Sequence, residues 1–438
     1  MAATSARGVV LGNPAFVAPL CWAAIILDGF DLVVLGALIP TLTDASAGAP
    51  WMTTAQATFI STIGLVGMTL GALAIGTATD IIGRRKALIG AVAAFSVMTL
   101  LCGFAQGPTS LGVYRFLAGV GLGGCLPTAI AIVTEFSQRG TAGKASTTMM
   151  TGYHVGAVAT ALLGLALLHT LGWRSMFFAG AIPGLLLLPV MFRELPESPA
   201  FLLAKGRPDA ARQVAEHYGL PLEAPPVDPA AKAEVPLRTL LSPAFLRNSV
   251  AIWVTSFCGL LLVYALNTWL PKLMVQANYG LQQGLWFLML LNAGAVVGLL
   301  VAGRVGDRIG LRLGAILWFL GGAIFLATLS VRMPIGILYL MVFLTGCFVF
   351  SAQVLVYAFT AASHPPQVRA TAVGMSAGVG RVGAIVGPLL GGLLVGLGIG
   401  HPWGFYIFAI VGFLGAVALS TARETATSRV RAAKANAA

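Results

Sequence analysis

Twelve long apolar stretches constrain this chain more than any other feature. Each holds roughly 20 residues, about the length that an α-helix needs to cross the hydrocarbon core of a bilayer. Six stretches precede a polar segment at 193–247 and six follow it. They cover residues 16–40, 55–79, 87–106, 110–134, 146–168, 174–192, 249–270, 284–303, 313–330, 335–360, 370–396 and 403–421. We therefore predict an all-α membrane protein with twelve transmembrane helices in two halves of six.

The composition excludes a soluble fold. Hydrophobic residues make up 58% of the 438 and charged residues only 9%, whereas soluble domains contain about 25% charged residues. The 54 glycines suit the close packing of membrane helices. The five cysteines lie in apolar stretches and form no CxxC pair. We interpret them as packing residues rather than as disulfides or metal ligands.

Lysine and arginine are distributed very unevenly over the expected loops. With both termini on one side, 21 of the 26 basic residues fall on that side and 3 on the other. An excess of positive charge marks the cytoplasmic side. We therefore predict a bacterial inner-membrane protein with both termini in the cytoplasm. The same distribution explains the net charge of +12 without nucleic acid as a partner.

The polar segment divides the chain into two halves. We expect a first six-helix half at 1–192, a cytoplasmic linker at 193–247, a second half at 248–424 and a cytoplasmic tail at 425–438. The linker contains nine prolines. We predict one short helix in it, at 206–218, and no apolar core.

A short motif repeats after the second helix of each half. The first copy has the pattern GxxxDxxGRR, with Gly76, Asp80, Gly83, Arg84 and Arg85. The second copy has the pattern GxxxDRxGxR, with Gly303, Asp307, Arg308, Gly310 and Arg312. Parallel internal repeats are typical of one large class of transporters.

Both loops resemble the signature GxxxD(R/K)xGRR of the major facilitator superfamily. They depart from it at Ile81, where that family has Arg or Lys, and at Leu311, where it has Arg. The fourth stretch carries a further similarity, RxxxGxGxG, which begins at Arg115. The resemblance covers essentially the whole chain and implies the major facilitator fold.

A narrower resemblance points to the aromatic acid:proton symporters of that superfamily. Its residues are the DGFD motif at 28–31, the segment TWLPKLM at 268–274, and GRVGAIVGP at 380–388. The PESP motif at 196–199 is less specific, because sugar porters share it. The resemblance implies proton-coupled uptake of an aromatic carboxylate such as benzoate or a hydroxybenzoate.

Charged side chains inside the spans are candidates for function, because each costs about 2.5–3.5 kcal/mol at the bilayer centre. Asp28 and Asp31 are three residues apart and share one helix face. Two carboxylates at low dielectric resist ionising together, so one of them is suited to carry a proton. The alternative is that they pair with lysine or arginine and hold the bundle together.

Three more ionisable residues lie within the spans. We assign Arg115 and His154 to proton coupling, with a structural ion pair and simple packing as the respective alternatives. Arg381 lies in a glycine-rich span, and its guanidinium could hold a substrate carboxylate through two hydrogen bonds. Its alternative is a buried pair with an aspartate of the first helix.

Spans seven and ten offer aromatic and polar groups for an aromatic acid. The substrate-binding candidates there are Tyr264, Asn267, Gln353 and Tyr357. Charged residues at the expected cytoplasmic ends are gating candidates, since such contacts could close one side and break when the halves move. They are Asp80, Arg84, Arg85, Glu135, Arg139, Asp307, Arg308 and Arg312. The alternative is that these charges only set the topology.

No enzyme motif, nucleotide-binding loop or metal-ligand spacing is present in the sequence. We expect a monomeric transporter that uses no cofactor and has the substrate, protons and the lipid bilayer as partners. The alternatives are a drug/proton antiporter, a porter of another organic acid or a sugar, and a non-transporting sensor. The antiporter motif GPxxGG occurs only at 387–392, in span eleven and not in span five, which favours uptake.

Overall fold

The computed structural model describes residues 10–46, 49–137, 142–220 and 239–423. Every described regular element is a helix. The side chains at 80, 142–147, 366, 367 and 370 are not described.

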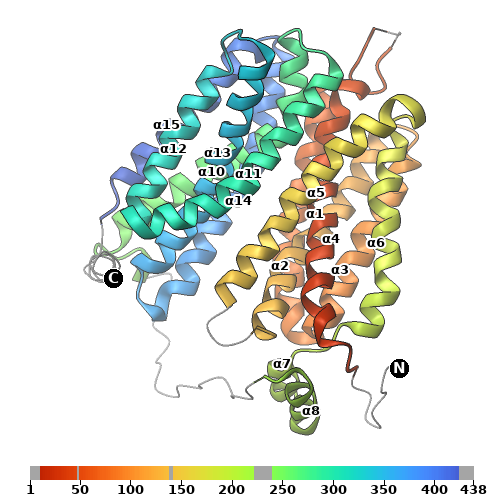
Figure 1. The fold of residues 1–438 in the computed structure, drawn as a ribbon, viewed down its shortest axis with the longest axis vertical. Coiled ribbons are helices and arrows are strands. Elements are labelled where there is room, and N and C mark those ends of the chain that lie inside the picture. Colours follow the sequence, from red (N-terminus) through yellow and green to blue (C-terminus); the bar gives the residue numbers. More distant parts are fainter. Residues whose placement is uncertain (1–9, 47–48, 138–141, 221–238, 424–438) are drawn as a thin grey trace. The chain divides into compact units, whose positions relative to one another are not determined.

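Twelve helices are long and apolar enough to span a membrane, as predicted. The first six are α1 (Val17–Leu42), α2 (Thr54–Ile82), α3 (Arg84–Gly103), α4 (Pro108–Glu135), α5 (Ala142–Leu171) and α6 (Arg174–Glu194). The other six are α10 (Leu246–Gln276), α11 (Leu281–Ile309), α12 (Leu311–Thr328), α13 (Ile335–Ser363), α14 (Pro366–Gly396) and α15 (Phe405–Ser420). Figure 1 shows the order of these helices along the chain.

The chain forms two compact units. Unit 1 holds most of α1 and α2 together with α3–α6 and the segment that follows α6, and unit 2 holds α10–α15. The last residues of α1 with the turn after it, Ile39–Asp44, and the segment Thr53–Thr58 at the start of α2 cluster with unit 2. Within unit 1, α3 packs on α4 and α6; within unit 2, α10 packs on α14, α11 on α13, and α12 on α15.

Glycine allows the closest of these helix contacts. A Cβ at Gly29 of α1 would collide with the carbonyl oxygen of Tyr153 in α5, and a Cβ at Gly156 would collide with that of Ile26. In unit 2, Gly383 of α14 meets the carbonyl oxygen of Phe257 in α10 in the same way. Small residues let membrane helices approach backbone to backbone.

The two copies of the repeated motif share one backbone conformation. Gly83 (φ 101°, ψ 153°) precedes α3, and Gly310 (φ 91°, ψ 143°) precedes α12. A positive φ favours glycine, which has no Cβ to clash with the backbone. The final glycine of each motif is therefore required by the sharp turn between two consecutive helices.

The segment after α6 contains two short helices, α7 (Pro199–Ala204) and α8 (Pro208–Tyr218). The helix predicted at 206–218 is confirmed as α8. The expectation of no apolar core is wrong for this part, because Leu202 and Val214 form a small buried cluster against Leu11 and Phe136. The other short elements are 3₁₀ turn Pro14–Phe16 and π turn Gly400–Gly404.

Candidate functional site

Asp31 lies at the centre of a buried polar junction of three helices. Its Oδ2 accepts from Arg115 Nη1 of α4 at 2.7 Å, and its Oδ1 accepts from Thr99 Oγ1 of α3 at 2.5 Å. Arg115 Nη2 also donates to the Asp31 carbonyl oxygen at 3.0 Å. Asp31 is 1% exposed and Arg115 5%. The structure thus contains the ion pair that was the structural alternative for Arg115.

Asp28 is fully buried one helical turn before Asp31. It lies within electrostatic range of Cys125 on α4. Cys125 in turn makes a long contact from Sγ to the Ala24 carbonyl oxygen, at 3.8 Å. The two aspartates therefore have different surroundings. Asp31 forms an ion pair with Arg115 of α4, whereas Asp28 lies nearer Cys125, which is ten residues further along α4.

His154 is buried in α5. Its ring meets Tyr153 edge to face, with centroids 5.0 Å apart. The preceding carbonyl, that of Tyr153, lies against Gly29, and Thr160 Oγ1 donates to the Phe30 carbonyl oxygen at 3.1 Å. The turn of α5 that carries His154 therefore packs on the turn of α1 that carries Asp28.

Four of the predicted substrate-binding residues come together in unit 2. Tyr357 of α13 interacts with Gln353 one turn earlier. It also lies within electrostatic range of Arg381 on α14 and of Tyr264 on α10. Gln353 is buried, and its Oε1 lies 2.4 Å from the position that a Cβ at Gly259 would occupy. Three helices thus supply a guanidinium, two phenol rings and an amide to one place.

Arg381 occupies an open face of α14. A Cβ at Gly374 or Gly378, two turns and one turn before it, would meet no atom within 4 Å. Arg381 itself is partly exposed. Among the described residues no acidic side chain forms an ion pair with it. The arrangement leaves its planar guanidinium available for an external carboxylate.

Asn267 is engaged differently from its predicted neighbours. Its Oδ1 accepts from Asn292 Nδ2 of α11 at 3.0 Å, and Asn292 Nδ2 also donates to the Leu288 carbonyl oxygen. Both asparagines are buried. Asn292 was not among the sequence candidates, although an asparagine in an apolar span is a signal that could have singled it out.

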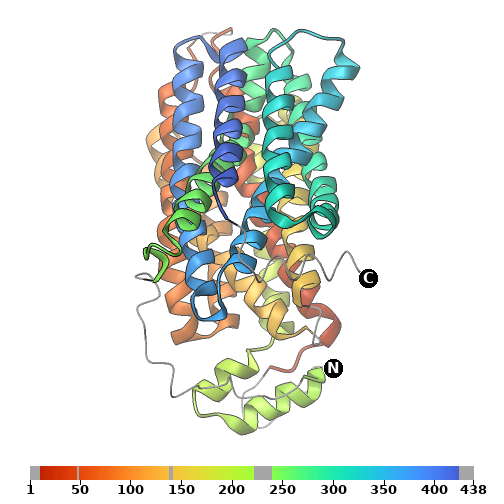
Figure 2. The ribbon, with the colours of Figure 1, turned by 90° about the vertical axis from the view of Figure 1, so that its left-hand side faces the viewer.

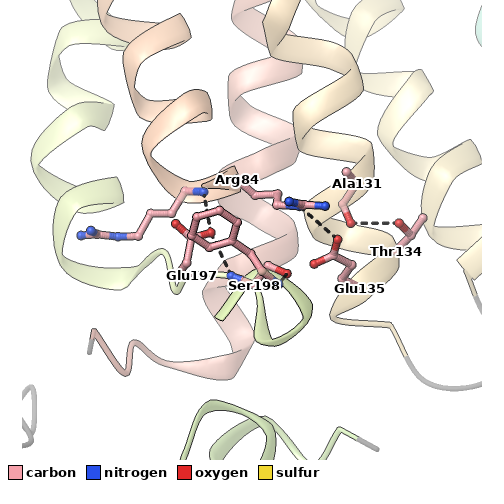
Figure 3. A network of polar contacts seen from close by, with 8 residues as sticks. Arg84, Ala131, Thr134, Glu135, Glu197 and Ser198 are labelled. Atoms are coloured by element: carbon pink, nitrogen blue, oxygen red, sulfur yellow. Dashed lines mark hydrogen bonds and ion pairs between the residues drawn. The ribbon is translucent and has the colours of Figure 1, made fainter. Parts of the chain in front are cut away.

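The first copy of the repeated motif forms a polar network at one end of unit 1 (Figure 3). Arg84 Nε lies 3.3 Å from Glu135 Oε1 at the end of α4. The Arg84 guanidinium also lies 5.8 Å from the centre of the Phe201 ring in α7. The predicted gating residues Arg84 and Glu135 are therefore paired.

Arg85 joins the same network through a residue that the sequence analysis did not select. Its backbone N–H and that of Ser198 donate to Glu197 Oε1, at 3.2 and 3.0 Å. Its side chain donates to the carbonyl oxygens of Leu195 and Phe192, at 2.7 and 2.6 Å. Glu197 belongs to the PESP motif at 196–199, which was the available signal.

The second copy is less connected. Asp307 and Arg308 are exposed, and neither makes a hydrogen bond or ion pair with another described residue. Arg312 donates from Nη2 to the Ser420 carbonyl oxygen at the end of α15. Among the described residues, the gating candidate Asp307 therefore has no arginine partner. The side chain of Asp80 and all of Arg139 lie outside the described residues.

Comparison with known proteins agrees with this architecture. The family model described as Major Facilitator Superfamily matches residues 21–375 and 286–438. The chain is 35% identical over 418 residues to the benzoate transport protein of Acinetobacter baylyi, covering 91% of this chain and 89% of that protein. It is 34% identical over 403 residues to the gentisate transporter of Corynebacterium glutamicum, with 91% and 85% covered.

A solved structure shares the fold at low sequence identity. The partially occluded, inward-open xylose transporter XylE from E. coli superposes with a TM-score of 0.71 at 16% identity. The match covers 92% of this chain and 96% of that one. At this identity the likeness concerns the fold alone.

Proposed function

Because the chain belongs to the major facilitator superfamily, and is a multi-pass membrane transporter rather than an enzyme, we propose that it carries an aromatic carboxylate into the cell together with protons. Benzoate and hydroxylated benzoates are the leading substrates. The relatives at 34–35% identity carry the names of benzoate and gentisate transporters, and both are matched over most of their length.

The observation that carries this proposal is the cluster around Tyr357. An aromatic acid has a flat apolar ring and one carboxylate, so a suitable site combines aromatic side chains with one cation. Arg381 supplies the cation, and Tyr264 and Tyr357 supply rings and hydroxyl groups within electrostatic range of one another. The open face of α14 at Gly374 and Gly378 leaves space beside the guanidinium.

Proton coupling rests on the buried acids of α1. Asp28 and Asp31 are both inside a span, where a lasting negative charge is costly. Arg115 balances the charge of Asp31. We infer that Asp28 is the group that takes up and releases the proton, with Asp31 and Arg115 holding α1 in place against α3 and α4.

We propose that the Arg84–Glu135 pair and the Arg85–Glu197 contacts act as a gate at one end of unit 1. They connect α3, the end of α4 and the start of α7 through a few polar bonds at the ends of spans. Such contacts can break and reform during the rocking motion by which this class of transporter exposes its site to each side in turn.

Uptake by proteoliposomes tests the proposal. Labelled benzoate, hydroxybenzoates, xylose and a neutral benzamide are offered with and without an inward proton gradient. We expect accumulation of the acids alone and its loss after a protonophore is added. Accumulation of xylose or benzamide in place of the acids would contradict the substrate assignment, and benzoate accumulation that survives the protonophore would contradict the coupling.

Arg381 variants test the site itself. Lysine keeps the charge but loses the two-pronged geometry of the guanidinium, so Arg381→Lys should bind benzoate more weakly and Arg381→Ala should not bind it measurably. Arg304→Ala is the matched control, because Arg304 is exposed near the end of α11 and, within the described part of the chain, donates only to the Leu300 carbonyl oxygen of its own helix. Normal benzoate affinity in both Arg381 variants would rule out this assignment.

A further inference from the structure

A groove of about 660 Å³ lies between α10 and α15 in unit 2. Its walls are mainly the side chains of Leu246, Val250 and Val254 on α10, with Ala418 and Thr421 on α15. Figure 2 shows the two helices side by side, α10 in green and α15 in dark blue. The groove lies at the end of unit 2 that the distribution of basic residues assigns to the cytoplasm.

The α10 wall is a continuous apolar stripe. Leu246, Val250 and Val254 are spaced four residues apart, so they follow one face of the helix over about 12 Å. They are 41%, 45% and 42% exposed. An apolar stripe of this kind on a membrane helix faces hydrocarbon, which suits an acyl chain.

Arginines border the groove at the end of α15. Arg247 lines the groove and donates from Nε to the Thr421 carbonyl oxygen at 2.7 Å. Arg312 donates to the adjacent Ser420 carbonyl oxygen. Asn248 fixes the next residues, since its side chain exchanges hydrogen bonds with the backbone N–H and carbonyl of Arg423, at 2.7 and 2.9 Å.

These contacts use only part of the donor capacity of the arginines. One nitrogen of each guanidinium caps a carbonyl at the end of α15. The two terminal nitrogens of Arg247 have no partner within the described residues, and its side chain is exposed. Each guanidinium carries five N–H donors, which suit a phosphate.

Among the described residues, acids do not balance the local charge. In the described part of unit 2, six arginines lie at the expected cytoplasmic ends of the spans: Arg247, Arg304, Arg308, Arg312, Arg369 and Arg423. Asp307 is the one acid described at those ends. The groove therefore joins an apolar channel to an excess of positive charge.

We propose that this groove binds an anionic phospholipid of the leaflet on that side. Its phosphate lies at Arg247 and near Arg423, and one acyl chain follows the stripe from Leu246 to Val254. Basic pockets between membrane helices on the cytoplasmic side are suited to anionic lipid headgroups. A zwitterionic lipid has no net charge to match the arginines, and a soluble anion makes no use of the apolar wall.

Native mass spectrometry of the full chain in detergent tests this assignment. The probes are phosphatidylglycerol and phosphatidylcholine with identical acyl chains, each titrated alone. We expect phosphatidylglycerol to bind at least about tenfold more tightly, since an arginine near an anionic headgroup contributes about fivefold and several are present. Equal binding of the two lipids would overturn the proposal.

Two variants separate the headgroup from the acyl chain. Arg247→Gln should weaken phosphatidylglycerol binding about fivefold, and Val250→Trp should weaken it by filling the groove while Arg247 stays in place. Arg304→Gln removes the same charge from an exposed residue that does not line the groove, so it should weaken binding much less than Arg247→Gln does. Unchanged binding in both Arg247→Gln and Val250→Trp, or an equal loss in Arg304→Gln, would refute the site.

Competition with glycerol 3-phosphate tests whether the groove binds a soluble anion instead of a lipid. At millimolar concentration it should not displace phosphatidylglycerol, because it lacks the acyl chain. Full displacement would show that the groove holds a soluble anion and would overturn the lipid assignment. The wild-type comparison of the two lipids needs no variant, so the proposal stays testable even if a variant does not fold.

Discussion

Removing the charge of Asp31 should destabilise unit 1 strongly. In Asp31→Asn, the Arg115 guanidinium keeps its position at 5% exposure but loses the carboxylate that accepts its 2.7 Å bond. Breaking a buried ion pair by removing one partner costs about 3–5 kcal/mol, because the remaining charge is uncompensated. The amide can still accept a hydrogen bond, so we expect the lower end of that range.

The neighbouring bond sets a scale for comparison. Thr99→Val removes one hydrogen bond to the same carboxylate, at 2.5 Å, and leaves the ion pair intact. A hydrogen bond to a charged group contributes about 1.5–3 kcal/mol. The predicted order of unfolding temperature is therefore wild type, then Thr99→Val, then Asp31→Asn.

Thermal unfolding of the purified chain in detergent measures this order. The double variant Asp31→Asn/Arg115→Gln removes both charges and should recover part of the loss of Asp31→Asn, since no uncompensated charge remains. An Asp31→Asn variant that unfolds at the wild-type temperature would refute the reasoning. A double variant whose loss of stability exceeds the sum of the losses in the two single variants would also refute it.

Three further predictions concern other parts of the chain. Glu197→Gln should speed hydrogen exchange of the Arg85 and Ser198 backbone amides, because Glu197 Oε1 accepts a hydrogen bond from both N–H groups. It should also slow or uncouple transport while benzoate affinity is retained. A large loss of affinity with normal turnover would contradict this. Asp307→Ala should have a much smaller effect on turnover than Glu135→Ala, because Glu135 pairs with Arg84 while Asp307 forms no ion pair with another described residue. Equal effects of the two substitutions on the transport rate would contradict this prediction. Burial lowers the pKa of His364, directly after α13, below its usual value of about 6.5. The folded state therefore binds fewer protons than the unfolded state, and stability should fall as the pH drops below about 6.5. His364→Gln should make the unfolding temperature depend less on pH between 7.5 and 5.5, and an unchanged slope would contradict the assignment.

The helices could be predicted because the bilayer fixes their length and composition. The predicted bounds of all twelve spans agree with the helices to within six residues, since an apolar stretch of about 20 residues has few other uses. The helix α7 was missed because six residues carry too little periodicity to be recognised. The repeated motif was visible as a pattern, but the positive φ of Gly83 and Gly310 that requires its last glycine appears only in the structure.

The partners of the charged residues could be predicted only in part. The sequence places Asp28 and Asp31 on one face of α1, but the contact with Arg115 depends on how α1, α3 and α4 are rotated against each other. Local spacing does not contain that information. The same limit applies to Glu197, which lies more than a hundred residues from Arg85 in the sequence and reaches it only after α6 brings the chain back.

The junction at Asp31 also predicts the number of protons. The buried acidic and basic side chains described in the spans of unit 1 are Asp28, Asp31, Arg115 and His154. A histidine without an added proton is neutral, so the charge balance depends on the first three. When all three are ionised their sum is one negative charge, so a single proton neutralises the set. Arg381 can in turn be neutralised by the substrate carboxylate. We therefore expect one proton to accompany each aromatic monoanion, which makes transport electroneutral.

An electroneutral cycle gains nothing from the membrane potential. A potential of 100 mV is worth about 2.3 kcal/mol for each net charge moved, which corresponds to roughly 50-fold accumulation. Proteoliposomes can be given a potassium diffusion potential without a pH gradient, or a pH gradient without a potential. Benzoate should accumulate only with the pH gradient, and Asp28→Asn should abolish that accumulation. Accumulation driven by the potential alone would show that a second proton moves, so that Asp31 must release Arg115 during the cycle.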